Sequence, residues 1–186
     1  PCLDVVGHRI PNYFVDRDSL DNKEELTNIG VLARDMADDE ALIIFPEGTR
    51  FSTEKLGKAI AALSETAPTR VKSASELRSV LPPRTAGTLA ALAESNADIV
   101  ICNHVGISDI SSLQQLRAAV PLQTELKFKL WRTPRSEVNQ TQFVEWLDAQ
   151  WAIVDDWVTN NEDVTSPLSK PASLNANKTA ATIEKE

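Results

Sequence analysis

The chain has too few cysteines and histidines for a disulfide framework or a histidine-rich metal centre. Its 186 residues include two of each, and the cysteines, Cys2 and Cys102, lie far apart. Small disulfide-bonded domains and zinc sites need several such residues at short spacings. We therefore expect a protein of a reducing compartment, with neither a metal nor a cofactor bound by these side chains.

Long apolar runs and an excess of basic residues are also missing. No run approaches the roughly eighteen apolar residues of a membrane-spanning helix, and the chain does not open on a basic, apolar signal peptide. The net charge of −8 argues against nucleic acid as a partner. A content of 42% hydrophobic and 25% charged residues is typical of a soluble globular domain.

Alternating strands and helices indicate an α/β fold. Short apolar runs predict strands at 12–16, 41–45, 79–81, 98–102 and 124–131. The last of these alternates polar and apolar residues, as a half-exposed edge strand does. Apolar residues at helical spacing predict helices at 21–37, 54–64, 85–95 and 109–119. Strand–helix–strand order favours parallel neighbours, so we expect a layered mixed, mostly parallel sheet flanked by helices.

A longer helix is predicted at 140–158, followed by a polar tail. One stripe of this helix is apolar and consists of Phe143, Leu147, Trp151, Val154 and Val158. Acidic residues on the same helix would repel anionic lipid, so we expect the stripe to pack on the sheet. From residue 160 the chain has almost no large apolar residues. We expect one domain at 1–159 and a disordered tail at 160–186.

The most informative motif follows the predicted strand 41–45. An apolar residue, a proline, a carboxylate, a glycine, a hydroxyl and a guanidinium follow one another in the run Phe45-Pro46-Glu47-Gly48-Thr49-Arg50. Glycine permits a turn and close approach of the backbone, and hydroxyl and guanidinium groups suit a phosphate. Ligands of α/β proteins bind where strands end in this way. A surface turn with an ion pair would show the same pattern.

This run resembles the third sequence block of the PlsC-like glycerolipid acyltransferases, the lysophosphatidate (1-acylglycerol-3-phosphate) acyltransferase family. Residues 12–18, an apolar strand closed by Arg17, are similar to the second block, and residues 79–88, with Pro82, are similar to the fourth. The resemblance covers residues 8–90 closely and the chain to about 158 more loosely. It implies the glycerolipid acyltransferase fold without its N-terminal part.

The first block of that family, Asn-His followed by four residues and Asp, does not precede the second block here. We therefore expect the catalytic histidine and aspartate to lie upstream of residue 1, and this chain alone to be inactive. In the family, the histidine takes the proton of the acceptor hydroxyl as the oxygen attacks a thioester, and the aspartate orients the imidazole.

The resemblance implies an enzyme of phospholipid biosynthesis. It would transfer a fatty acyl group from acyl-CoA or acyl-carrier protein to lysophosphatidate or a related lysophospholipid, without a cofactor. It would be cytoplasmic, with peripheral contact at the inner face of the membrane. The substrate-binding residues that the resemblance implies are Arg17, Phe45, Pro46, Glu47, Gly48, Thr49, Arg50 and Pro82. Arg17, Thr49 and Arg50 would meet the acceptor phosphate, Glu47 a glycerol hydroxyl, and Pro82 the acyl donor.

A second match to the first-block pattern lies at 103–109, where Asn103-His104 is followed by Asp109. It comes after the fourth block, so it departs from the family order. His104 and Asp109 are candidates for a general base and the residue that orients it. We favour a structural role, with His104 at a strand end and Asp109 at the start of the next helix, because so short a pattern often arises by chance.

Three functions thus remain open from the sequence. The first is the acyltransferase. The second is a non-catalytic phosphate- or lipid-binding module that retains only the acceptor pocket. The third is an unrelated hydrolase-like enzyme using His104 and Asp109.

Overall fold

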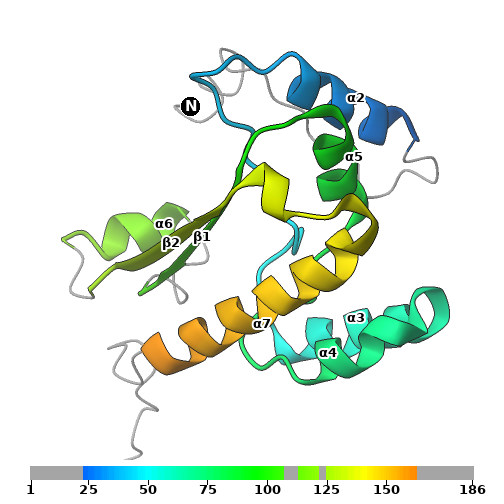
Figure 1. Cartoon of the computed structure of the whole chain (residues 1–186). Helices are drawn as coiled ribbons and strands as arrows, with labels where there is room; N and C mark the ends of the chain where they lie inside the picture. Colours follow the sequence, from blue (N-terminus) through cyan, green and yellow to red (C-terminus); the bar gives the residue numbers. More distant parts are fainter. Residues whose placement is uncertain (1–22, 107–112, 122–124, 163–186) are drawn as a thin grey trace, which may run out of the picture.

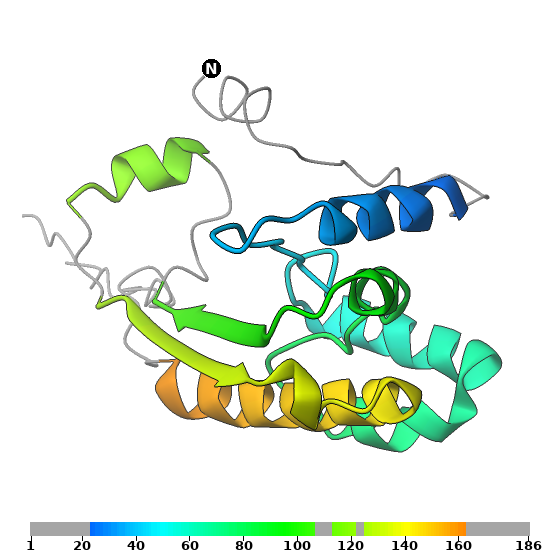
Figure 2. The same ribbon diagram turned by 45° about the horizontal axis from the view of Figure 1, so that its top comes forward.

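The computed structural model describes residues 23–106, 113–121 and 125–162. Its elements are α2 (Lys23–Arg34), α3 (Thr53–Thr66), η1 (Pro68–Arg70), α4 (Val71–Ser75), α5 (Ala86–Glu94), β1 (Ile99–Val105), α6 (Leu113–Ala118), β2 (Lys127–Thr133), η2 (Arg135–Glu137), η3 (Gln140–Gln142) and α7 (Phe143–Asn161). In Figures 1 and 2, α7 runs along one face of the β1–β2 sheet, with α3 and α4 beside it. No helix within the described ranges combines the length and the apolar content that crossing a bilayer requires.

The sheet consists of β1 and β2, which pair in antiparallel register. Ile99 lies opposite Thr133, and Val105 opposite Lys127. The strands predicted at 98–102 and 124–131 are therefore confirmed, with bounds shifted by a few residues. The expected mostly parallel sheet stays a prediction, because its proposed strand 12–16 lies outside the described residues.

Two further strand predictions, at 41–45 and 79–81, are wrong for the described structure. A strand exists only where its backbone groups bond to a neighbouring strand. At 79–81 the three N–H groups bond instead to carboxylates of Asp155 and Glu47. Residues 41–45 have no strand partner among the described residues, and the predicted neighbour 12–16 is not described.

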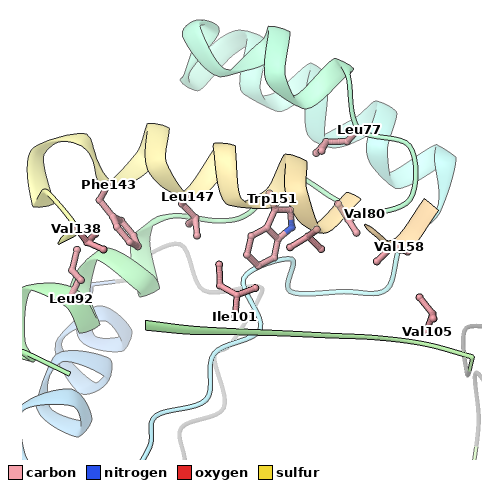
Figure 3. Packing of buried hydrophobic residues seen from close by; sticks show 11 residues of the cluster. Leu77, Val80, Leu92, Ile101, Val105, Val138, Phe143, Leu147, Trp151 and Val158 are labelled. Carbon is pink, nitrogen blue, oxygen red and sulfur yellow. The ribbon is translucent and has the colours of Figure 1, made fainter. Parts of the chain in front are cut away.

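The predicted stripe of α7 is confirmed as the centre of the core. Its five apolar residues, Phe143, Leu147, Trp151, Val154 and Val158, are all buried. Figure 3 shows Trp151 between α7 and β1, with Ile101 below it and Val80 beside it, and Leu77 belongs to the same cluster. Because an α-helix has about 3.6 residues per turn, these apolar residues lie on one continuous face of α7, and that face is packed.

A second packed pair is α2 with α5, which lie side by side in Figure 2. Glycines let the helices approach closely, since a Cβ on Gly30 would lie 3.2 Å from Glu94 Cγ and one on Gly87 would lie 3.3 Å from Ile29 Cδ1. An ion pair of 2.6 Å between Arg34 and Glu94 joins the same helices. Helices α2 and α5 confirm the helices predicted at 21–37 and 85–95.

The outer face of the sheet exposes several large apolar side chains. Along each strand, alternate side chains point toward α7 and away from it. The outward set includes Val100, Phe128 and Leu130, which are all exposed. The alternation predicted for 124–131 is therefore confirmed, but the apolar residues occupy the exposed side.

Candidate functional site

Two irregular segments that are distant in sequence meet beside α7: residues 45–50, called here the 45–50 turn, and residues 78–84, called the 78–84 segment. The Gly48 N–H closes the turn by donating to the Phe45 carbonyl at 3.0 Å. Gly48 has φ +68°, a conformation that favours glycine. The Arg84 N–H then donates to the Pro46 carbonyl at 2.9 Å. The segments resembling the third and fourth blocks therefore lie in direct contact.

The Glu47 carboxylate points into the protein rather than toward solvent. Its Oε2 accepts a hydrogen bond of 2.9 Å from the Leu81 N–H. Burial raises the pKa of the Glu47 carboxyl, while the Leu81 N–H and the indole of Trp151 lower it and the charge of Asp155 raises it. The buried Nε1 of Trp151 is near enough for this effect, although it makes no hydrogen bond of acceptable geometry in the described structure.

The raised pKa of Glu47 predicts a pH dependence of stability. The folded state holds this proton more tightly than the unfolded state, so the contribution of Glu47 is fully present below the ordinary glutamate pKa. It is lost as pH rises through the folded pKa, with a slope of at most about 1.4 kcal/mol per pH unit. Urea unfolding from pH 4 upward should therefore show wild type losing stability relative to Glu47→Gln. The exposed Glu65→Gln is the matched control, and equal curves for wild type and Glu47→Gln would contradict this.

Two cations reach consecutive residues of the 45–50 turn. Lys55 Nζ donates to Thr49 Oγ1 at 2.9 Å and to the Arg50 carbonyl at 3.0 Å. The Arg84 guanidinium lies over Gly48, where an added Cβ would be 3.4 Å from Cζ. Neither Lys55 nor Arg84 has a carboxylate partner within the described part of the chain. The exposed side of the turn is therefore locally cationic in a protein of net charge −8.

Lys55 is positioned by the start of α3. The Ser52 side chain caps this helix by accepting from the Lys55 N–H at 3.3 Å. A serine in this position satisfies one of the free N–H groups of the first turn. Lys55 therefore leaves the helix in its first turn, directly beside the 45–50 turn that precedes it.

The predicted substrate-binding residues are only partly brought together. Thr49 and Arg50 are exposed in the turn, and Phe45 is 83% exposed. Pro82 is buried in the 78–84 segment. Arg17 lies outside the described residues, so its predicted contact with the acceptor phosphate is untested.

His104 lies on the outer face of β1, with its ring centroid 6.1 Å from that of Phe128. Ile101 and Val105, which alternate with it, are buried on the α7 side. Glu47 lies near Trp151 of α7, so the strand separates His104 from the 45–50 turn. Asp109 lies outside the described residues, and the proposed pair is untested.

Sequence reasoning missed the acidic residues of α7 that hold the 78–84 segment. Asp155 accepts from the N–H groups of Arg78, Ser79 and Val80. Asp148 pairs with Arg70, whose Nη2 also donates to the Pro83 carbonyl at 2.8 Å. In the sequence these aspartates resemble the solvated side of a helix, and only their spacing of seven residues places them on one face.

A shallow open groove of about 380 Å³ lies between β2 and the last turns of α7. Lys129, Ile153, Asp156 and Trp157 are among its lining residues, and none of the predicted site residues is. Within residues 23–106, 113–121 and 125–162, no three acidic, histidine or cysteine side chains gather as metal ligands would. The 45–50 turn therefore remains the candidate site.

Comparison of the chain with protein-family models, with curated proteins and with solved structures finds no match in any of the three. The resemblance to the acyltransferase family therefore rests on the motifs themselves.

Proposed function

We propose that this chain carries the acceptor-binding part of a glycerolipid acyltransferase. The acceptor would be lysophosphatidate or a related lysophospholipid, and the donor acyl-CoA or acyl-carrier protein. The observation that supports this most is the contact between the 45–50 turn and the 78–84 segment, through the Pro46 carbonyl and the Glu47 carboxylate. Two motifs that resemble blocks of one family thus meet in one place.

The chemistry of the turn fits a phosphorylated acceptor. Lys55, Arg84 and the Thr49 hydroxyl provide cationic and neutral donors on its exposed side. Charge-assisted hydrogen bonds to a phosphate are stronger than neutral ones, and guanidinium groups suit its geometry. Because the chain as a whole is acidic, this attraction for anions is local rather than general.

The described side chains of the turn support binding rather than proton transfer. The turn has no histidine, and its one carboxylate, Glu47, is engaged by the Leu81 N–H. A general base must lie within hydrogen-bond reach of the acceptor hydroxyl. The proposal therefore gives the turn the role of holding the acceptor, while the base belongs to another part of the enzyme.

Variants of the complete gene product test the proposal. Arg17→Ala and Glu47→Ala should each lower acyl transfer about a hundredfold, a typical scale for a lost charge-stabilising group in a site. Transfer of labelled acyl groups from acyl-CoA to lysophosphatidate measures this directly. Lys58→Ala is the control, because Lys58 pairs with Glu54 on the exposed side of α3. Wild-type turnover in both test variants would contradict the mapping.

The alternative is a non-catalytic phosphate- or lipid-binding module that uses the same turn. It is favoured by the absence of a general base beside the turn in the described structure. The two functions differ in one result: a module binds lysophosphatidate but releases no thiol from acyl-CoA in its presence.

A further inference from the structure

The 78–84 segment has no regular secondary structure, yet its backbone is bonded almost throughout. The N–H groups of Arg78, Ser79 and Val80 donate to Asp155 Oδ1 at 2.8, 2.7 and 3.3 Å. The next N–H, of Leu81, donates to Glu47. Pro82 and Pro83 have no N–H, the Pro83 carbonyl accepts from Arg70, and the Arg84 N–H donates to the Pro46 carbonyl. Such a segment is held in one conformation by its surroundings.

Two carboxylates carry most of this support. Asp155 is 3% exposed, and its remaining oxygen accepts from Arg78 Nε at 3.2 Å. A buried carboxylate is costly unless it is paired or hydrogen-bonded. The partners of the Asp155 carboxylate include backbone N–H groups of the 78–84 segment, so its charge stabilises the conformation of that segment. Glu47 does the same for the adjoining residue from the opposite side.

The segment ends at Arg84, whose guanidinium lies over Gly48 without a hydrogen bond or ion pair to any described residue. Lys55 reaches the adjoining Thr49. Two positive groups therefore converge on consecutive residues, and neither is paired with a carboxylate among the described residues. A Cβ at position 48 would stand 3.4 Å from Arg84 Cζ and Nε, which is ordinary van der Waals contact, so glycine is favoured here by its positive φ.

We propose that Glu47 and Asp155 are positioning residues, which hold the 78–84 segment so that Arg84 stands over the 45–50 turn and selects a phosphate monoester as the acceptor headgroup. This inference rests on the proposed function. It assigns Glu47 to the Leu81 N–H in place of a glycerol hydroxyl. Arg84 becomes a specificity-determining residue, and a dianionic monoester is preferred because two cations face it.

Binding of glycerol 3-phosphate to the complete gene product, measured by calorimetry, tests this without acyl transfer. Arg84→Ala should weaken binding about ten- to a hundredfold, the range for one hydrogen bond to a charged group. Glu47→Ala and Asp155→Asn should weaken it similarly. Asp156→Asn is the matched control, because Asp156 is exposed and contacts only the Arg78 side chain. It should bind as wild type does.

The decisive comparison uses double variants. If Glu47 and Asp155 act through Arg84, adding Glu47→Ala or Asp155→Asn to Arg84→Ala should weaken binding no further. Additive losses would overturn the proposal, because they mean that these carboxylates act independently of Arg84. Unchanged binding in the single variants would overturn it as well. If Glu47→Ala does not fold, the Asp155→Asn cycle decides alone.

Two further comparisons complete the test. The first distinguishes a phosphate-monoester site from a general anion site, and the second distinguishes failure of this inference from failure of the proposed function. Inorganic phosphate should bind more weakly than glycerol 3-phosphate, and glycerol should not compete; equal binding of the two phosphates means a general anion site and overturns the selection of a monoester headgroup. If the complete gene product transfers no acyl group but the binding losses of the double variants are non-additive, the enzyme function is refuted and the positioning role is supported. Active transfer with additive losses would refute the positioning role alone.

Discussion

Replacing Trp151 with alanine should lower the free energy of unfolding by about 3–5 kcal/mol, the range for deleting a large buried aromatic side chain. Trp151 is 7% exposed and lies between α7 and β1, in contact with the main hydrophobic cluster. Its indole also lies beside Glu47. The cavity would therefore open where the core meets the candidate site, and neighbouring side chains cannot fill it without moving the helix.

Urea denaturation followed by far-UV circular dichroism measures this loss. Trp157→Ala is the matched control, since Trp157 lies on the same helix and is only partly buried. We expect a smaller loss for the control. A loss for Trp151→Ala equal to or below that of Trp157→Ala would show that Trp151 is not central to the core.

Breaking the pair between Arg70 and Asp148 should have an effect of similar size. Asp148→Ala should lower the free energy of unfolding by up to about 3–5 kcal/mol, because it leaves a largely buried guanidinium without its counter-charge. The side chains of Arg70 and Asp148 are 12% and 13% exposed and lie 2.6 Å apart. Arg70 also supports the Pro83 carbonyl, so the same variant should loosen the 78–84 segment.

The double variant Arg70→Met/Asp148→Leu should recover much of the lost stability, since apolar side chains of similar volume often replace a buried ion pair well. The exposed pair of Lys58 and Glu54 gives the control, and Lys58→Ala should cost less than about 1 kcal/mol. Equal losses for Asp148→Ala and Lys58→Ala, measured by the same urea unfolding, would contradict the assigned burial of the pair.

The elements that sequence reasoning placed well are those whose signal is local. Helices α2, α3, α5 and α7 follow apolar residues at helical spacing, and every member of the α7 stripe is buried. Both described strands follow apolar or alternating runs. These patterns are sufficient to predict helices and strands because the spacing of apolar residues can be recognised within a single segment.

The predictions that did not hold required a partner segment. An apolar run such as 41–45 becomes a strand only if another strand supplies hydrogen bonds, and the described residues supply none there. The two prolines after Leu81 likewise remove N–H groups that a strand would need, while Asp155 and Glu47 take the others.

The sequence shows which residues form the 45–50 turn, but it does not show which way the Glu47 carboxylate points. The resemblance to the acyltransferase family assigned Glu47 to a glycerol hydroxyl of the acceptor. In the structure Glu47 Oε2 accepts from the Leu81 N–H and the Arg84 guanidinium lies over the turn, while the contact of Glu47 with a hydroxyl stays a prediction. The sequence likewise does not show that Asp148 binds Arg70 or that Asp155 accepts from backbone N–H groups of the 78–84 segment.

The order of residues therefore determined by itself where helices form, which face of α7 is buried, and which short runs resemble an acyltransferase. Only the tertiary structure decided which backbone groups the acidic side chains bind and which cationic side chains are left to bind an anion. The physical reason is that helical and strand periods act between neighbours along the chain. The partners of a buried charge are instead chosen by packing among segments far apart in it.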